Sequence, residues 1–318
     1  MPHFQTRDGA QLHYLDVGRG PAVVMLHAFG MRAAMWLPFV LPFALRRRFI
    51  LLDFRGFGGS RGVRLSQPDA LRQNADDVHD LIQHLQLQRP KLVGYSIGAA
   101  TGLEYQRRYG FERIAAYLHV DQTPCIANRE GWSWGLMGGD NEQAFERARE
   151  LLAAFEPFGL DTPFLQLPRS LQQQFWTWFA EFFGNCIGNP LWKLLFRLGG
   201  GSRPGLLIDP DDWPIYLACV RAFVEQDYDF RESLRRVRVP LWVIVGRRSA
   251  VFPPEGQRRI ADYAPETRVI EFGWCGHIVP VEAPGRFMLT LKRFLALRPP
   301  PAQLLPLHAH DQTRRTAA

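Results

Sequence analysis

The chain has 318 residues, of which 47% are hydrophobic and 22% are charged, so it can bury a large core as one domain or as a domain with a large insertion. Its formal net charge is +7, but the basic residues are scattered, with short clusters at residues 46–48, 235–236 and 247–248, which argues against a nucleic-acid partner. The four cysteines have no C-x-x-C spacing, which argues against a zinc or redox site and predicts reduced, partly buried thiols.

The beginning of the chain shows no targeting signal. Residues 1–6 start directly in strand-like sequence, without the basic and then apolar segments of a signal peptide. The sequence has no run of about 18 uncharged apolar residues, so we expect no transmembrane helix. These observations predict a cytoplasmic location, whereas the oligomeric state has no signal in the sequence.

Strand-like and helix-like segments alternate along most of the chain. The expected strands are residues 12–17, 22–26, 49–52, 92–93, 114–120, 241–245 and 268–272, and the expected helices are 67–87, 99–109 and 285–297. Residues 22–26 form a continuous apolar run, which is typical of a strand buried on both faces. Ser66 is a candidate N-cap for the first long helix. The alternation predicts an α/β fold with a mostly parallel sheet flanked by helices.

The alternation stops after Asp121. The next hundred or so residues hold no segment typical of a buried strand, and they are rich in Phe and Trp within helix-like stretches. We expect residues 122–235 to form a helical cap inserted into a core made of residues 1–121 and 236–298. Most of its aromatic residues should form the cap's own core, and a few should face the cleft below. Residues 299–318 begin with three prolines and are expected to form a flexible tail.

The most informative motif is G-x-S-x-G at residues 94–98, between a strand-like run and a helix-like run. This position fits a nucleophile elbow, in which a serine on a sharp turn exposes its hydroxyl. The two glycines leave room for the strand and the helix to pass closely. The first helical N–H groups then point toward the reacting carbonyl oxygen.

Four further segments follow predicted strands. They are His27-Ala28-Phe29-Gly30, residues 53–60, residues 246–255 and residues 273–284. With the elbow, they resemble the α/β-hydrolase fold family, in the branch with H-G-x-G, D-x-R-G-x-G-x-S, G-x-S-x-G and G-H-x-x-x-x-E-x-P. The resemblance extends from about Phe4 to Leu297, although the expected cap is similar only in position and composition.

The resemblance implies roles for several residues. Ser96 would be the nucleophile and His277 its general base, because a serine hydroxyl needs a base within hydrogen-bond reach. The backbone N–H groups of Phe29 and Ile97 would form the oxyanion hole. His27 would brace its loop, and Asp53 with Arg55 would fix loops beneath the site. The resemblance implies no metal and no organic cofactor.

The sequence departs from the family at one position. Ser249 stands where the family usually has the catalytic aspartate, and serine cannot carry the charge that orients the histidine. One alternative is Asp121, which ends the strand after the nucleophile helix, although it could also cap a loop. A second is another carboxylate, such as Asp140 or Glu255. A third is a serine–histidine dyad, or a site that binds without turnover.

The leading functional prediction is a serine hydrolase that cleaves a carboxylic ester, thioester or lactone of a hydrophobic small molecule through an acyl-enzyme. The alternatives are haloperoxidase-like perhydrolysis, carbon–carbon bond hydrolysis and acyl transfer on the same fold. A catalytically degenerate ligand-binding homologue is a further alternative, favoured by the absence of aspartate at position 249.

Overall fold

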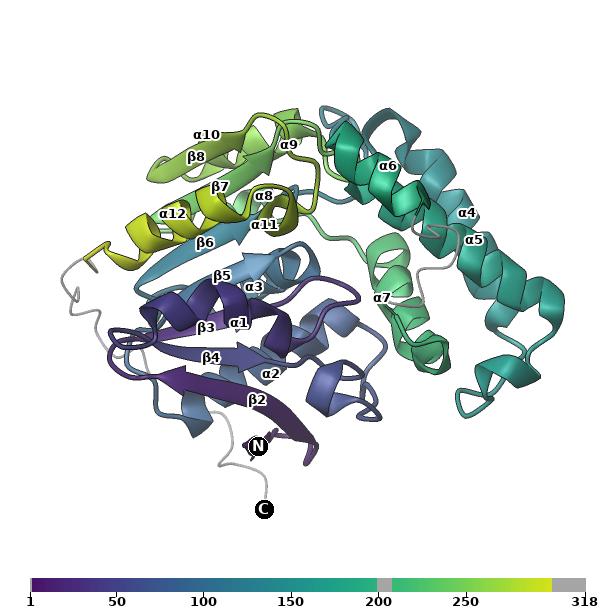
Figure 1. The fold of residues 1–318 in the computed structure, drawn as a ribbon, viewed down its shortest axis with the longest axis horizontal. Coiled ribbons are helices and arrows are strands. Elements are labelled where there is room, and N and C mark those ends of the chain that lie inside the picture. Colours follow the sequence, from purple (N-terminus) through teal and green to yellow (C-terminus); the bar gives the residue numbers. More distant parts are fainter. Residues whose placement is uncertain (1, 199–207, 299–318) are drawn as a thin grey trace, which may run out of the picture.

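The computed structural model describes residues 2–198 and 208–298, so the predicted tail at 299–318 lies outside the described residues. Its centre is an eight-stranded sheet with the strand order β1-β2-β4-β3-β5-β6-β7-β8 (Figure 1). The strands are β1 (His3–Gln5), β2 (Gln11–Gly18), β3 (Ala22–Leu26), β4 (Arg48–Leu52), β5 (Lys91–Tyr95), β6 (Ala116–Val120), β7 (Leu241–Gly246) and β8 (Thr267–Phe272). The pairs β1–β2 and β2–β4 are antiparallel and all the others are parallel. The predicted α/β fold with a mostly parallel sheet is confirmed.

The central strands are buried on both faces, as the apolar run in β3 predicts. Val23 and Met25 pack on one face with Trp36 and the C-terminal helix, whereas Val24 packs on the other. Side chains alternate between the two faces of a strand, so both layers of helices draw on the same short segment for their hydrophobic contacts.

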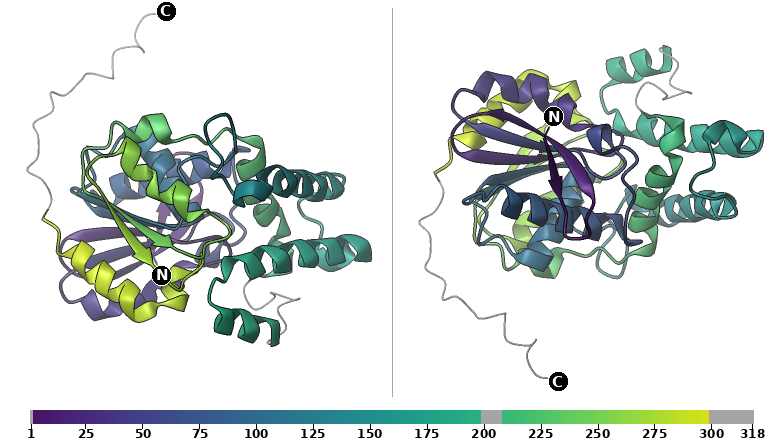
Figure 2. Two further views of the ribbon diagram at one scale, coloured as in Figure 1. Left: turned by 90° about the horizontal axis from the view of Figure 1, so that it is seen from above. Right: turned by 90° about the horizontal axis from the view of Figure 1, so that it is seen from below.

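Helices cover both faces of the sheet (Figures 1 and 2). One face carries α1 and α12, and the other carries α2 and α3. The helices of this core are α1 (Leu37–Val40), α2 (Ala70–His84), α3 (Ile97–Tyr109), α8 (Arg231–Leu234), α9 (Pro254–Arg258), α10 (Ile260–Tyr263), α11 (Val279–Glu282) and α12 (Pro284–Leu295). None of the helices within residues 2–198 and 208–298 is long and apolar enough to cross a membrane.

The start of α2 corrects one prediction. Its N-cap is Asp69, whose carboxylate accepts the backbone N–H of Arg72 at 3.0 Å, and not Ser66. The reason is Pro68, since the residue before a proline is disfavoured in helical conformation and Gln67 therefore stays outside the helix. The hydroxyl of Ser66 instead donates to the Gln73 side chain.

A group of helices follows β6 and lies beyond the carboxyl ends of the parallel strands (Figures 1 and 2). They are α4 (Asn141–Phe155), α5 (Arg169–Cys186), α6 (Pro190–Leu198) and α7 (Trp213–Glu225). Phe155, Phe175, Phe179 and Trp213 are nearly fully buried and contact one another in pairs. Many of the aromatic residues in this segment therefore form its own core, as expected.

Candidate active site

Ser96 occupies a strained turn between β5 and α3. Its φ of +56° lies in a region that non-glycine residues rarely adopt, at a cost of about 1–3 kcal/mol. Two backbone contacts hold the turn: its N–H donates to the Val120 carbonyl at 3.0 Å, and its carbonyl accepts the Ala100 N–H at 2.9 Å. The sequence predicts this turn, and the structure has it at the expected residues.

The glycines on either side of Ser96 are required by close packing. A Cβ on Gly94 would lie 2.4 Å from the Gly98 carbonyl oxygen, and a Cβ on Gly98 would lie 2.6 Å from the Leu26 carbonyl oxygen. Both contacts are with backbone atoms that cannot easily move. Strand β5, helix α3 and strand β3 therefore pass as closely as the motif predicts.

The structure brings Ser96 and His277 into direct contact. Nε2 of His277 lies 2.8 Å from the Ser96 hydroxyl, and both residues are buried, with exposed fractions of 4% and 6%. His277 comes from the loop between β8 and α11, and Tyr95 donates a hydrogen bond to its carbonyl at 3.0 Å. A base at this distance can take the hydroxyl proton.

Asp121 lies on the other side of the imidazole. Its Oδ1 is 2.8 Å from Nδ1 of His277, and its side chain is fully buried. Because a carboxylate accepts, Nδ1 carries the proton and Nε2 is left to accept from the serine. Asp121 adopts a φ of +47°, which short polar side chains such as aspartate tolerate better than most.

Ser249 is part of the same network. Its hydroxyl donates to Asp121 Oδ1 at 2.7 Å, and the Gly246 N–H donates to Oδ2 at 2.8 Å. The carboxylate thus lies just after β6, while the end of β7 and the loop that follows supply two donors that hold it in place. Glu255 does not belong to this network, because it is over half exposed and pairs with Arg258. Asp140 is also exposed, at the start of α4.

Histidine 119 supports the turn that carries Asp121. Its Nε2–H donates to the Gln122 carbonyl at 2.8 Å. Burial lowers the pKa of His119 to about 4, so this imidazole is neutral near pH 7. The turn after β6 therefore gains a fixed hydrogen bond without adding a charge beside the carboxylate.

Ile97 and Phe29, two residues that line the cavity with Ser96, carry the backbone N–H groups that are candidate oxyanion donors. Ile97 is the first residue of α3, and the first N–H groups of a helix have no intrahelical acceptor. The second N–H belongs to Phe29, and His27 fixes its direction. The backbone N–H of Phe54 donates to Nε2 of His27 at 3.1 Å, so Nδ1 carries the proton and donates to the Ala28 carbonyl at 2.8 Å.

The Ala28–Phe29 peptide is planar, so holding its carbonyl in one direction points the Phe29 N–H in the opposite one. Burial lowers the pKa of His27, which favours the neutral imidazole that this pattern requires. Ala28 is not among the residues with positive φ, so it fits where the resemblance has glycine.

Asp53 and Arg55 hold the loops beneath the site. The Asp53 carboxylate accepts the Ala33 and Gly59 backbone N–H groups and contacts His13. Arg55 is 2% exposed and forms ion pairs with Asp8 and Asp77. Both residues are structural, as the sequence predicts, and neither belongs to an exposed turn.

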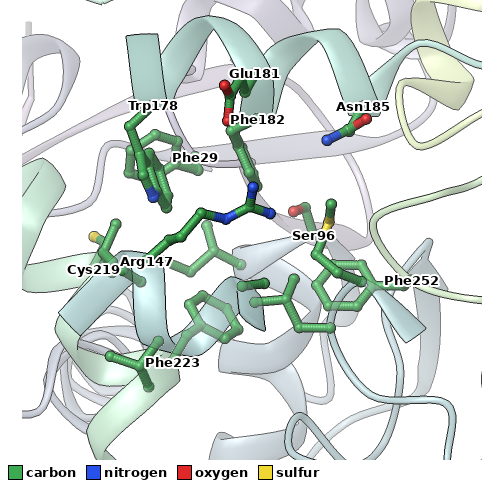
Figure 3. Close-up of a pocket in the computed structure, with 17 residues that line it drawn as sticks. Phe29, Ser96, Arg147, Trp178, Glu181, Phe182, Asn185, Cys219, Phe223 and Phe252 are labelled. Carbon is green, nitrogen blue, oxygen red and sulfur yellow. The ribbon is translucent and has the colours of Figure 1, made fainter. Parts of the chain in front are cut away.

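A largely apolar cavity opens above Ser96 (Figure 3). It encloses about 870 Å³, including its open mouth. The core contributes Phe29, Ser96, Ile97 and Phe252, and the helical segment contributes Leu136, Met137, Ala144, Arg147, Ala148, Trp178, Glu181, Phe182, Asn185, Cys219, Val220, Phe223 and Val224. Trp178, Phe182 and Phe223 are the aromatic residues of the segment that face the cavity.

The end of α5 is hydrogen-bonded to the loop of His277. The N–H groups of His277 and Ile278 both donate to the carbonyl of Cys186, the last residue of α5, at 2.8 and 3.3 Å. The Glu282 carboxylate accepts the N–H groups of Gly188 and Asn189 after α5, and of Gly276 beside the histidine. The glutamate of the G-H-x-x-x-x-E-x-P pattern is the one sequence signal for this link, but its partners Gly188 and Asn189 lie far away in sequence.

The part of the chain that the structure describes contains no cluster of three or more His, Cys, Asp or Glu side chains able to hold a metal ion. The four cysteines are free and buried.

Comparison with known proteins assigns the fold family. A family model described as alpha/beta hydrolase fold matches residues 21–284. The chain belongs to the α/β-hydrolase fold family. This α/β-hydrolase is thus a member of an enzyme class, and its mostly parallel sheet flanked by helices is the fold of its structural neighbours.

Relatives of this α/β-hydrolase carry different activities in their names. The pimeloyl-[acyl-carrier protein] methyl ester esterase of Nitrosomonas europaea is 25% identical over 280 residues, covering 88% of this chain and 97% of the relative. The non-heme chloroperoxidase CPO-A1 of Kitasatospora aureofaciens is 26% identical over 314 residues, covering 93% and 99%. An esterase structure from Exiguobacterium antarcticum has a TM-score of 0.71 at 20% identity, covering 92% and 98%, and shows the same fold.

Proposed function

We propose that this α/β-hydrolase cleaves a carboxylic ester, or a related thioester or lactone, through an acyl-enzyme formed on Ser96. The observation that carries the proposal is the continuous chain of hydrogen bonds from the Ser96 hydroxyl through His277 to Asp121, with 2.8 Å at each step. Relatives named as esterases support the same chemistry.

In the proposed reaction, Ser96 attacks the acyl carbon while Nε2 of His277 takes the hydroxyl proton. Asp121 stabilises the imidazolium that forms and keeps the ring in the required orientation. The Ile97 and Phe29 N–H groups stabilise the oxyanion. The proton then passes from His277 to the leaving alcohol. In the second half, His277 activates a water that cleaves the acyl-enzyme and releases Ser96.

We further propose that residues 122–235 act as a cap over the site. The support is that α4, α5 and α7 supply most of the cavity wall, with apolar side chains opposite Ser96. Such a wall favours a hydrophobic substrate body and excludes water from the acyl-enzyme.

A fluorophosphonate probe tests the nucleophile, and a panel of p-nitrophenyl esters tests the reaction. We expect Ser96 to be labelled and medium-length acyl esters to be cleaved, with both signals lost in Ser96→Ala. Ser60→Ala, which changes another buried serine, is the control and should keep the label. A wild-type protein that is folded but neither labelled nor active would refute the proposal and favour a ligand-binding homologue.

Perhydrolysis is a second candidate function, because a non-heme chloroperoxidase is among the relatives. The same serine, histidine and aspartate would form the acyl-enzyme, and hydrogen peroxide would replace water as the acceptor. Comparing the rates of peracid and acid formation from one ester at several peroxide concentrations separates the two functions.

A further inference from the structure

The cavity contains a cation that the proposed chemistry does not use. Arg147 comes from α4, and Figure 3 shows its side chain extending across the cavity toward Ser96. The walls around it are mostly apolar, with Trp178, Phe182 and Phe223 among the lining residues. Arg147 itself is exposed to solvent at the mouth of the cavity, so its guanidinium is free to meet an anionic group that enters with a substrate.

Arg147 also differs from many arginines of this protein. Fourteen arginines of the described part form ion pairs, among them Arg55 and Arg108 in the core and Arg129 and Arg221 near the helical segment. The Arg147 side chain forms no ion pair and no hydrogen bond with any other described residue, although its backbone is part of α4. Its helix neighbour Arg149 lies over the ring of Phe145, outside the cavity lining.

We propose that Arg147 binds a carboxylate of the substrate, so that the preferred ester is a small apolar molecule with one anionic end. This inference rests on the proposed hydrolase function and names its substrate class. The planar guanidinium matches a carboxylate with two parallel hydrogen bonds. A singly charged carboxylate also costs less to bring between apolar walls than a phosphate group with nearly two charges.

Glu181 is the opposing charge to consider. It lies on α5, at another wall of the cavity, and the described residues show no ion pair between it and Arg147. Its carboxylate would repel an anionic substrate, which limits how far the anion can extend past Arg147 toward α5. The net charge of +7 acts in the opposite sense, because it attracts small anions to the protein.

Matched pairs of esters test the proposal. Monomethyl esters of straight-chain dicarboxylic acids, from succinate to suberate, carry one carboxylate, and the dimethyl esters of the same acids carry none. We expect kcat/KM for the best monomethyl ester to exceed that for its dimethyl ester by about tenfold or more, the usual size of a charge-assisted hydrogen bond. The preference should depend on chain length, because the carboxylate has to reach Arg147 while the ester lies at Ser96.

Three variants assign this preference to its residue. Arg147→Gln should lower the monomethyl-to-dimethyl ratio about tenfold or more, Glu181→Gln should raise it severalfold, and Arg149→Gln on the same helix should leave it within about twofold. Increasing salt should lower the ratio in the wild type more than in Arg147→Gln.

The outcomes separate this inference from the proposed function. If neither ester is cleaved and Ser96 is not labelled, the hydrolase proposal fails and this inference with it. If the dimethyl esters are cleaved and Ser96 is labelled, but the ratio is near one or is the same in Arg147→Gln, only the substrate inference is overturned. A melting temperature and dimethyl-ester turnover show whether each variant is folded.

Discussion

The two sides of the cavity are built differently. On the core side, Ser96, His277 and Asp121 lie on loops fixed by buried hydrogen bonds, and His27 and Asp53 hold the loops beneath them. On the side of the helical segment, the wall consists mainly of apolar side chains from α4, α5 and α7. If the proposed function holds, the core would keep the reacting atoms in one geometry, and the helical wall would set which molecules reach them.

The largest expected effect comes from the core side, at the carboxylate. Asp121→Asn should lower kcat by roughly a hundredfold or more, because the amide cannot stabilise the imidazolium. Ser249→Ala should have little effect, since Gly246 and His277 still bond the carboxylate. Steady-state kinetics on one p-nitrophenyl ester measures both. The reverse result would remove Asp121 from the mechanism.

A second substitution, in the loop after β7, should restore part of the activity that Asp121→Asn loses. The Ser249 hydroxyl lies 2.7 Å from Asp121 Oδ1, so a carboxylate at position 249 should come close to His277. We expect Asp121→Asn/Ser249→Asp to regain about tenfold in kcat over Asp121→Asn, which is part of the loss. If a folded double variant shows no recovery of kcat, a carboxylate at position 249 cannot replace the one that follows strand β6.

A smaller effect on the same side tests the oxyanion donor. His27→Ala removes the hydrogen bond that orients the Ala28–Phe29 peptide, and kcat should fall about tenfold with less change in KM. His13→Ala is the matched control, because His13 is also buried and bonds Asp53 but does not touch that peptide. Equal losses in both variants would indicate a general loss of stability.

On the helical side, we expect changes in selectivity. Phe182→Ala enlarges the cavity opposite Ser96 and should shift the preferred p-nitrophenyl acyl chain to longer substrates, with kcat for the preferred ester within about fivefold of the wild type. Phe158→Ala, in the same segment but away from this cavity, should leave the chain-length profile as it is. If both variants shift the preferred chain length, the shift does not come from the wall of this cavity.

The smallest effect concerns stability and pH. Burial raises the pKa of Glu104 on α3 to about 7, so the folded chain keeps this proton between pH 4.5 and 7 after the unfolded chain has lost it. Glu104 therefore makes the protein less stable as pH rises through that window. Glu104→Gln should flatten the decline and add about 1 kcal/mol at pH 8, because the loss of the ion pair with Arg107 offsets most of the ~3 kcal/mol that the raised pKa implies. Urea unfolding at several pH values measures the free energy of unfolding. Glu146 is exposed, so Glu146→Gln is the control and should leave the pH dependence unchanged.

Much of the core could be predicted from sequence because its signals are local. The strand β3 was predicted at its observed bounds, and the G-x-S-x-G turn could be identified from the glycines that its close packing requires. The position of the carboxylate could not be settled, since three alternatives remained after Ser249 was recognised. Choosing Asp121 needs the distance between β6 and the His277 loop, which no local pattern contains.

The helical wall could be predicted only in outline. Its aromatic composition indicated a helical segment, but which few rings face Ser96 depends on how α4 and α5 pack on the core. No sequence pattern distinguishes Arg147 from other arginines, because an arginine on an amphipathic helix is usually solvated. Its significance depends on the cavity that other elements build around it.

The hydrogen bonds from His277 and Ile278 to the end of α5 have a mechanical consequence. A ligand that displaces α5 would also move the backbone of His277, because the two are hydrogen-bonded at Cys186. A change in how the substrate fits would therefore also change the position of the imidazole. Replacing this helix to broaden the range of substrates should therefore also change the turnover rate. A design that inserts a foreign segment here needs a backbone carbonyl at position 186 that accepts the same two N–H groups.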